Sequence, residues 1–125
     1  MNIKIKTIPH NWQRYDTVGD WEMREDDTLI IKVSRMDNWK YELLVGFHEL
    51  VETVLCKDRV ILQADVDEFD MLYEKNRKEG DVSEPGNSPN APYYKEHKFA
   101  TKLEKMLAKE LNVDWKKYDD TVINL

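Results

Sequence analysis

The stretch LLVGFHELVETVLC, Leu43 to Cys56, sets a histidine and two glutamates within an otherwise apolar run. Apolar residues recur there at the three- and four-residue spacing of an α-helix, starting from Trp39, and Asp37 can cap the N-terminus. The run therefore predicts a helix over residues 37–57. We expect one face of an N-terminal sheet to pack on this helix, because its apolar side has to be covered.

The polar residues of this helix divide between two sides. At about 100° of rotation per residue, His48 and Glu52 fall on one flank beside apolar residues, whereas Glu49 falls on a polar side. We therefore expect His48 and Glu52 to face inward and Glu49 to face solvent. The apolar side comprises Trp39, Leu43, Phe47, Leu50 and Val54, extended by Leu44, Val51 and Leu55, and the polar side comprises Glu42, Glu49 and Thr53.

Residues 1–35 are rich in β-strand signals. The sequence NIKIKTI, residues 2–8, alternates isoleucine with lysine or threonine, which predicts a half-buried strand that Pro9 ends. Two apolar-bearing segments flank Asp26 and Asp27, a pattern that indicates a β-hairpin. Because strands precede helices, the order predicts an α+β fold, with an N-terminal antiparallel hairpin or sheet packed against three helices.

The second half of the chain predicts two more helices and a long loop, all within one domain of residues 1–125. Asp65 can cap a surface helix over residues 65–79. Residues 80–92 hold three of the four prolines and two of the four glycines, which indicates a loop. An amphipathic helix follows over residues 92–112. In the C-terminal segment, 113–125, we expect Trp115 and Tyr118 to pack back before a short β-branched end.

The helix predicted over residues 92–112 carries a second inward polar pair. Its lysines form one solvated face, and His97 and Glu104 lie away from that face, flanked by the small residues Ala100 and Ala108. Two buried histidines and two buried carboxylates are costly unless they bond to one another or bind a cation. Both a metal site and a metal-free polar network satisfy this requirement.

For the metal site, we predict His48, Glu52 and His97 as ligands of a divalent metal. Glu104 would be a fourth ligand or would orient His97, and Glu49 is the candidate general base. Histidine and glutamate favour zinc, with magnesium or manganese as alternatives. Asp67, Asp70 and Glu74 could supply further oxygen ligands, although nearby lysines and an arginine also explain them as a solvated face.

Composition limits the classes of function. The net charge of −6 argues against nucleic-acid binding as the main activity, since a phosphate backbone requires a basic surface. A single cysteine, Cys56, excludes an intrachain disulfide and the four-cysteine zinc sites. No apolar run approaches the length of a membrane span, so we expect a cytoplasmic protein with no membrane partner. A protein partner or a homo-oligomer remains open.

Three resemblances bear on function. HELVE, residues 48–52, resembles the metal helix of zincin metallopeptidases, with Glu52 in place of their second histidine; the resemblance implies His48 as a ligand and Glu49 as the base. Glu49, Glu52, Asp67 and Asp70 resemble the magnesium-binding carboxylates of MazG-type nucleotide pyrophosphohydrolases. More broadly, HELVETVLC, VDEFD, EPGNSPNAPYYKEH and a closing VDW are similar to a set found in small uncharacterised phage or prophage proteins.

These observations lead to two functional hypotheses. The first is a phage-type protein with a His/Glu divalent-metal site, acting as a metal-dependent hydrolase. The alternative is a noncatalytic protein-interaction or structural module in which the same residues form a metal-free buried network.

Overall fold

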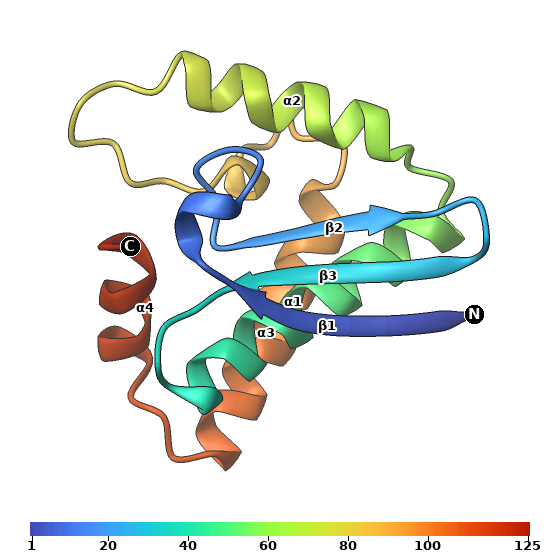
Figure 1. The fold of residues 1–125 in the computed structure, drawn as a ribbon. Helices are drawn as coiled ribbons and strands as arrows, with labels where there is room; N and C mark the ends of the chain where they lie inside the picture. Colours follow the sequence, from blue (N-terminus) through green and yellow to red (C-terminus); the bar gives the residue numbers. More distant parts are fainter.

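The computed structural model describes all 125 residues and begins with a three-stranded sheet (Figure 1). The strands are β1 (Asn2–Ile8), β2 (Gly19–Met23) and β3 (Thr28–Ser34), in the order β1-β3-β2. The predicted hairpin is confirmed, since β2 and β3 pair antiparallel. β1 instead runs parallel to β3, so the sheet is mixed rather than wholly antiparallel. Alternation predicts a strand but carries no information about its direction.

Four helices follow the sheet, which confirms the α+β prediction. They are α1 (Trp39–Asp58), α2 (Gln63–Lys75), α3 (Tyr94–Glu110) and α4 (Trp115–Ile123), with short 3₁₀ turns at His10–Trp12 and Pro85–Asn87. In Figure 1, α1 and α3 lie together on one face of the sheet, α2 runs beside β2, and α4 stands apart at one end. None of the helices combines the length and the apolar composition that crossing a membrane requires.

The helix boundaries differ from the predicted ones for local reasons. The cap of α1 is Asn38, whose side chain accepts hydrogen bonds from the backbone N–H groups of Lys40 and Tyr41, while Asp37 lies before it with φ 54°. The C-terminal segment, 113–125, for which the sequence analysis gave no helix, contains a fourth helix. Residues 115–123 form α4, because Asp114 caps them by accepting from the backbone N–H of Lys117.

The core forms between β3 and the inward face of α1. Leu29, Ile31 and Val33 of β3 are completely buried, and Leu44 and Val45 of α1 are buried with them. The expectation that the side of Trp39, Leu43 and Val54 would face the core is wrong, since these three side chains are exposed. The helix is apolar on most of its circumference, so periodicity alone could not decide which side faces the sheet.

Gly46 lets α1 approach the sheet closely. A Cβ atom at this position would lie 2.9 Å from Cγ2 of Ile5 in β1 and 3.5 Å from Cγ2 of Val33 in β3. Glycine at this position therefore allows α1 to pack directly on β1 and β3.

The outer edge of β2 is covered by the start of α2. The side-chain amide of Gln63 donates to the carbonyl oxygen of Trp21 at 2.8 Å and accepts from the N–H of Met23 at 3.2 Å. One side chain thus replaces the backbone pairing that a further strand would supply. This fixes α2 beside the sheet, where Val66 and Asp70 are its only buried residues.

We predict that Val60→Gly stabilises the protein by about 1 kcal/mol, because a β-branched residue is strained in the left-handed region that glycine adopts freely. Val60 follows α1 with φ 56°, in a turn closed by a hydrogen bond from the N–H of Ile61 to the carbonyl of Cys56. Urea unfolding measures the change.

Asn112→Gly is the matched control for this prediction. Asn112 occupies the same position after α3 with φ 54°, and asparagine tolerates that conformation, so a gain of only a few tenths of a kcal/mol is expected. Equal gains at both positions, or a loss at Val60, would contradict the strain assigned to Val60.

Candidate metal centre

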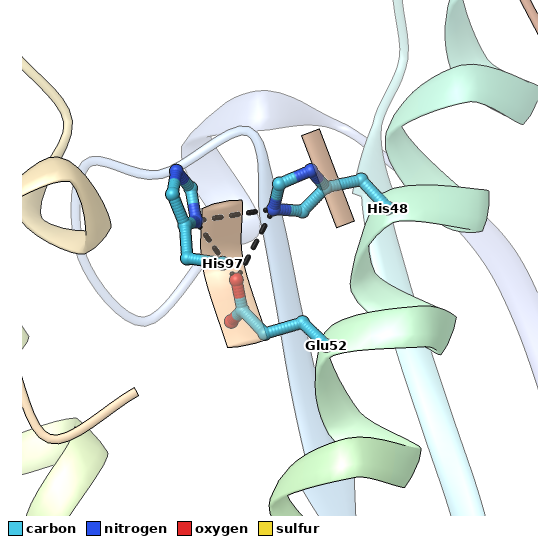
Figure 2. Close-up of side chains that lie close together, drawn as sticks. All are labelled: His48, Glu52 and His97. Atoms are coloured by element: carbon cyan, nitrogen blue, oxygen red, sulfur yellow. Dashed lines mark hydrogen bonds and ion pairs between the residues drawn. The ribbon is translucent and has the colours of Figure 1, made fainter. Parts of the chain in front are cut away.

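Two histidines and a glutamate from two helices meet in the interior. His48 and Glu52 lie one turn apart on α1, and His97 lies in the first turns of α3; all three are buried. Nε2 of His48, Nδ1 of His97 and Oε2 of Glu52 converge, with separations of 3.2 Å between the two nitrogens and 3.1 and 2.9 Å from them to the oxygen (Figure 2). This group, His48–Glu52–His97, could hold a metal ion.

The far nitrogen of each imidazole has its own carboxylate partner. Nδ1 of His48 lies 2.8 Å from Oε1 of Glu104, and Nε2 of His97 lies 2.9 Å from Oε2 of Glu84. The second oxygen of Glu104 accepts a hydrogen bond from the hydroxyl of Tyr118 at 2.6 Å. Carboxylates behind ligating histidines are typical of metal sites, where they fix the tautomer and the ring orientation.

This arrangement leaves three acceptor atoms facing one another. When the outer nitrogens of His48 and His97 donate to their carboxylates, the inner nitrogens present lone pairs toward Oε2 of Glu52. Three lone pairs within 3.2 Å of one another repel, so a positive charge is needed among them. Protons or a metal cation can supply it.

The pKa values of His48, Glu52 and His97 also show that this group favours a positive charge. Burial lowers the pKa of His48, but hydrogen bonds to Glu104 and Glu52 more than offset this and hold it well above its usual value. Burial opposes protonation of His97 as well, yet hydrogen bonds to Glu52 and Glu84 raise its pKa to about 9. Burial alone would raise the pKa of Glu52, and the two histidines lower it to about 2. Without a metal, the histidines therefore hold protons at neutral pH.

The donor set and its spacing fit a divalent metal. Two imidazole nitrogens and one carboxylate oxygen are the protein ligands of many catalytic zinc ions, which keep a further position open. Ligand atoms around a tetrahedral zinc lie about 3.4 Å apart when the bonds are about 2.1 Å. The observed separations of 2.9–3.2 Å need only a few tenths of an ångström of adjustment. The three ligands line a cavity of about 500 Å³ that can admit a further molecule.

Glu49 lies on the wall of this cavity, which corrects the expectation that it faces solvent. Its side chain is half-buried and packs against the start of β2, where a Cβ at Gly19 would lie 2.7 Å from Cγ of Glu49. Burial raises its pKa well above the usual value, and the neighbouring Glu52 raises it further. No protein group donates a hydrogen bond to its carboxylate. The helical wheel could not predict this position, because it depends on how α1 sits on β2.

Glu104 lies in a different place from the one that the sequence indicated, and Glu84 takes the place expected for it. Glu104 was expected as a fourth ligand or as the partner of His97, but it contacts His48 and stands outside the group of converging ligand atoms. The partner of His97 is Glu84, which sequence reasoning missed. Its only sequence signal is its place in the long loop of residues 80–92, since loops of that length are often functional.

A glycine of the same loop, residues 80–92, packs directly against His97. Gly86 is buried in the 3₁₀ turn Pro85–Asn87, and a Cβ at this position would collide with the imidazole ring of His97. Absence of a side chain at Gly86 therefore allows the loop to lie against His97 and to bring Glu84 to its outer nitrogen.

The acidic residues of α2 have other partners. Asp67 is paired with Arg14 at 3.1 Å, and Asp70 accepts hydrogen bonds from the hydroxyls of Tyr15 and Tyr93. The converging group consists of His48, Glu52 and His97, without the α2 carboxylates that a magnesium-type site would need.

Comparison with known proteins gave no match: no protein-family model, curated protein or solved structure is significantly similar to the chain.

We predict that Gly86→Ala lowers zinc affinity at least about tenfold, the scale of effects seen when the support behind a ligand is lost. The added methyl group would push the loop or the His97 ring away. Competition against a chromophoric chelator measures the affinity.

Gly80→Ala in the same loop is the control. Gly80 has φ 82° and no atom within 4 Å of where a Cβ would lie, so alanine there should cost about 1 kcal/mol of unfolding free energy through backbone strain alone. Zinc affinity should stay unchanged. If both variants lose zinc equally, the loss reflects general loosening of the loop and not the contact with His97.

Proposed function

We propose that this protein is a metal-dependent hydrolase that holds zinc through His48, Glu52 and His97. The observation that carries the proposal is the inward convergence of three lone-pair donors, each imidazole backed by its own carboxylate, beside an unpartnered glutamate in the same cavity. The similarity of HELVE to the zincin metal helix agrees with this reading and favours peptides as the substrate class.

Glu49 would act as the general base. A divalent metal at the site would supply the Lewis acidity that activates a water molecule and polarises a carbonyl group. The carboxylate of Glu49, free of protein hydrogen bonds, is available to accept a proton from that water. Burial and the neighbouring Glu52 raise its pKa above the usual value, which makes the carboxylate a stronger base.

The ligand types favour zinc over the alternatives. Two imidazole nitrogens suit zinc, whereas magnesium prefers oxygen ligands in an octahedron and retains several waters. Manganese is intermediate, since it accepts nitrogen ligands but binds them less tightly than zinc. We therefore expect zinc to bind most tightly, then manganese, with magnesium weakest.

We predict that protein purified without chelators binds about one zinc per chain and that zinc raises its melting temperature. His48→Ala or His97→Ala should abolish both effects, whereas Glu49→Gln should preserve them, because Glu49 is not a ligand. Elemental analysis and thermal unfolding provide the measurements.

The metal-free alternative gives a different outcome. If the network is dry, wild-type protein carries no stoichiometric metal and added metals leave its melting temperature unchanged. His97→Ala would then cost about 1–3 kcal/mol by leaving buried polar groups without partners.

We further predict that Glu49→Gln lowers hydrolysis at least about 100-fold while zinc content stays the same, since glutamine preserves the shape but cannot accept the proton. Unstructured peptides and nucleoside triphosphates should be screened as substrates, with Glu42→Gln on the same helix as the control. Wild-type activity that survives in Glu49→Gln would remove Glu49 from the mechanism. Activity on neither class would leave peptides and nucleotides unsupported as substrates.

The alternative function is a noncatalytic interaction module, and one observation favours it. The outer side of α1 leaves large apolar side chains uncovered, with 64% of Trp39 and 41% of Leu43 exposed. A helix with such a face can bind another protein. The metal analysis separates the two readings, because an interaction module needs no zinc.

A further inference from the structure

Two hydrogen bonds connect α4 to a proposed metal ligand. The hydroxyl of Tyr118 donates to Oε2 of Glu104 at 2.6 Å, and Oε1 of Glu104 lies 2.8 Å from Nδ1 of His48. All three side chains are buried. The two oxygens of one carboxylate are thus shared between the C-terminal helix and the imidazole.

α4 is held in the fold by tertiary contacts, and Tyr118 makes several of them. A helix of nine residues is unstable by itself in water, so α4 has to be held by tertiary contacts. Tyr118 is its only buried residue. The Tyr118 ring packs against the rings of Tyr41, at 5.2 Å between centroids, and Trp115, at 5.3 Å.

α4 also forms part of the wall of the cavity that contains the ligands. Trp115, Tyr118, Asp119 and Val122 all line it. Movement of α4 away from the body would therefore both release Glu104 from Tyr118 and open the cavity to solvent.

We infer that Tyr118 is a positioning residue that couples the docking of α4 to occupancy of the metal site, an inference that depends on the proposed metal centre. By holding Oε2, Tyr118 fixes the orientation of the Glu104 carboxylate. The carboxylate in turn fixes the His48 tautomer whose Nε2 lone pair points toward Glu52 and His97. A metal held by His48 would make its Nδ1–H a stronger donor to Glu104, which would strengthen the connection from the other end.

The coupling must act in both directions. If docked α4 increases metal affinity by some factor, then bound metal must favour the docked state of α4 by the same factor. Metal binding would thus favour the docked position of α4, in which this helix closes one wall of the cavity.

The second histidine lacks such a support. Glu84, which bonds to His97, belongs to a loop and has a side chain that is 51% exposed, and no hydroxyl holds its other oxygen. Of the two imidazoles, His48 is therefore the one whose outer carboxylate partner is itself held by α4.

The test compares Tyr118→Phe with Tyr41→Phe in the full-length protein. Each variant removes one hydroxyl and keeps the ring, but only Tyr118 donates a side-chain hydrogen bond to Glu104. We expect Tyr118→Phe to weaken zinc binding by about 10–100-fold and Tyr41→Phe to change it less than about twofold. Chelator competition gives the affinities.

Hydrogen exchange supplies the readout that a purely structural role would not move. Zinc should slow amide exchange across residues 115–123 in wild type and in Tyr41→Phe, and should lose most of that effect in Tyr118→Phe. If Tyr118→Phe proves unfolded, Glu104→Gln replaces it, since it keeps the side-chain shape, weakens the acceptor, and should lose zinc affinity at least tenfold.

The outcomes separate the coupling from the metal site itself. Unchanged zinc affinity in the folded variant, or exchange in α4 that ignores zinc in wild type, overturns the coupling and leaves the metal site standing. Failure of wild type to bind zinc overturns the metal site and the coupling together. Zinc binding without hydrolysis removes only the proposed activity.

Discussion

Three acceptor atoms meet in the interior of this protein: Nε2 of His48, Nδ1 of His97 and Oε2 of Glu52. A positive charge has to lie among them for the folded state to be stable. His48, Glu52 and His97 are buried, and three carboxylates, those of Glu52, Glu84 and Glu104, surround the two imidazoles. With neutral imidazoles this group would carry three negative charges, and the two on Glu52 and Glu104 are buried, which is costly in a low-dielectric interior. Two protons on the imidazoles and one divalent cation reduce that charge equally. A metal can therefore replace the protons without changing the electrostatic balance of the core.

The inward direction of the ligands could be predicted because local rules set it. His48 and Glu52 are four residues apart and share a helix flank, and Ala100 and Ala108 mark the side of α3 on which His97 lies. The meeting of the two polar pairs, His48–Glu52 and His97–Glu104, could be predicted as well, because burying either pair alone is costly. Local rules gave the wrong position for Glu49, because α1 is apolar on most sides and the sequence does not show that this carboxylate packs against Gly19 at the start of β2.

The remaining parts of the site depend on contacts between segments that are distant in sequence. Glu84 contacts His97 from an irregular loop. This contact requires that residue 86 have no side chain, because a Cβ there would collide with the imidazole of His97. Tyr118 reaches Glu104 from a helix that the β-branched end of the chain concealed. The parallel direction of β1 is of the same kind, since alternation in NIKIKTI fits either direction. Periodicity describes a segment and its faces, but not the neighbour that each face meets.

The side chain of Gln63 has a consequence for self-association. Sheets grow into fibres by adding strands at both edges, and an uncovered edge is a site for such growth. Here the amide of Gln63 occupies the backbone groups of Trp21 and Met23 on the β2 edge, which leaves β1 as the open edge of the sheet. Adding a strand at β2 would first require Gln63 to give up both hydrogen bonds, so growth at this edge is opposed, and β1 is the edge at which a strand can add without that loss.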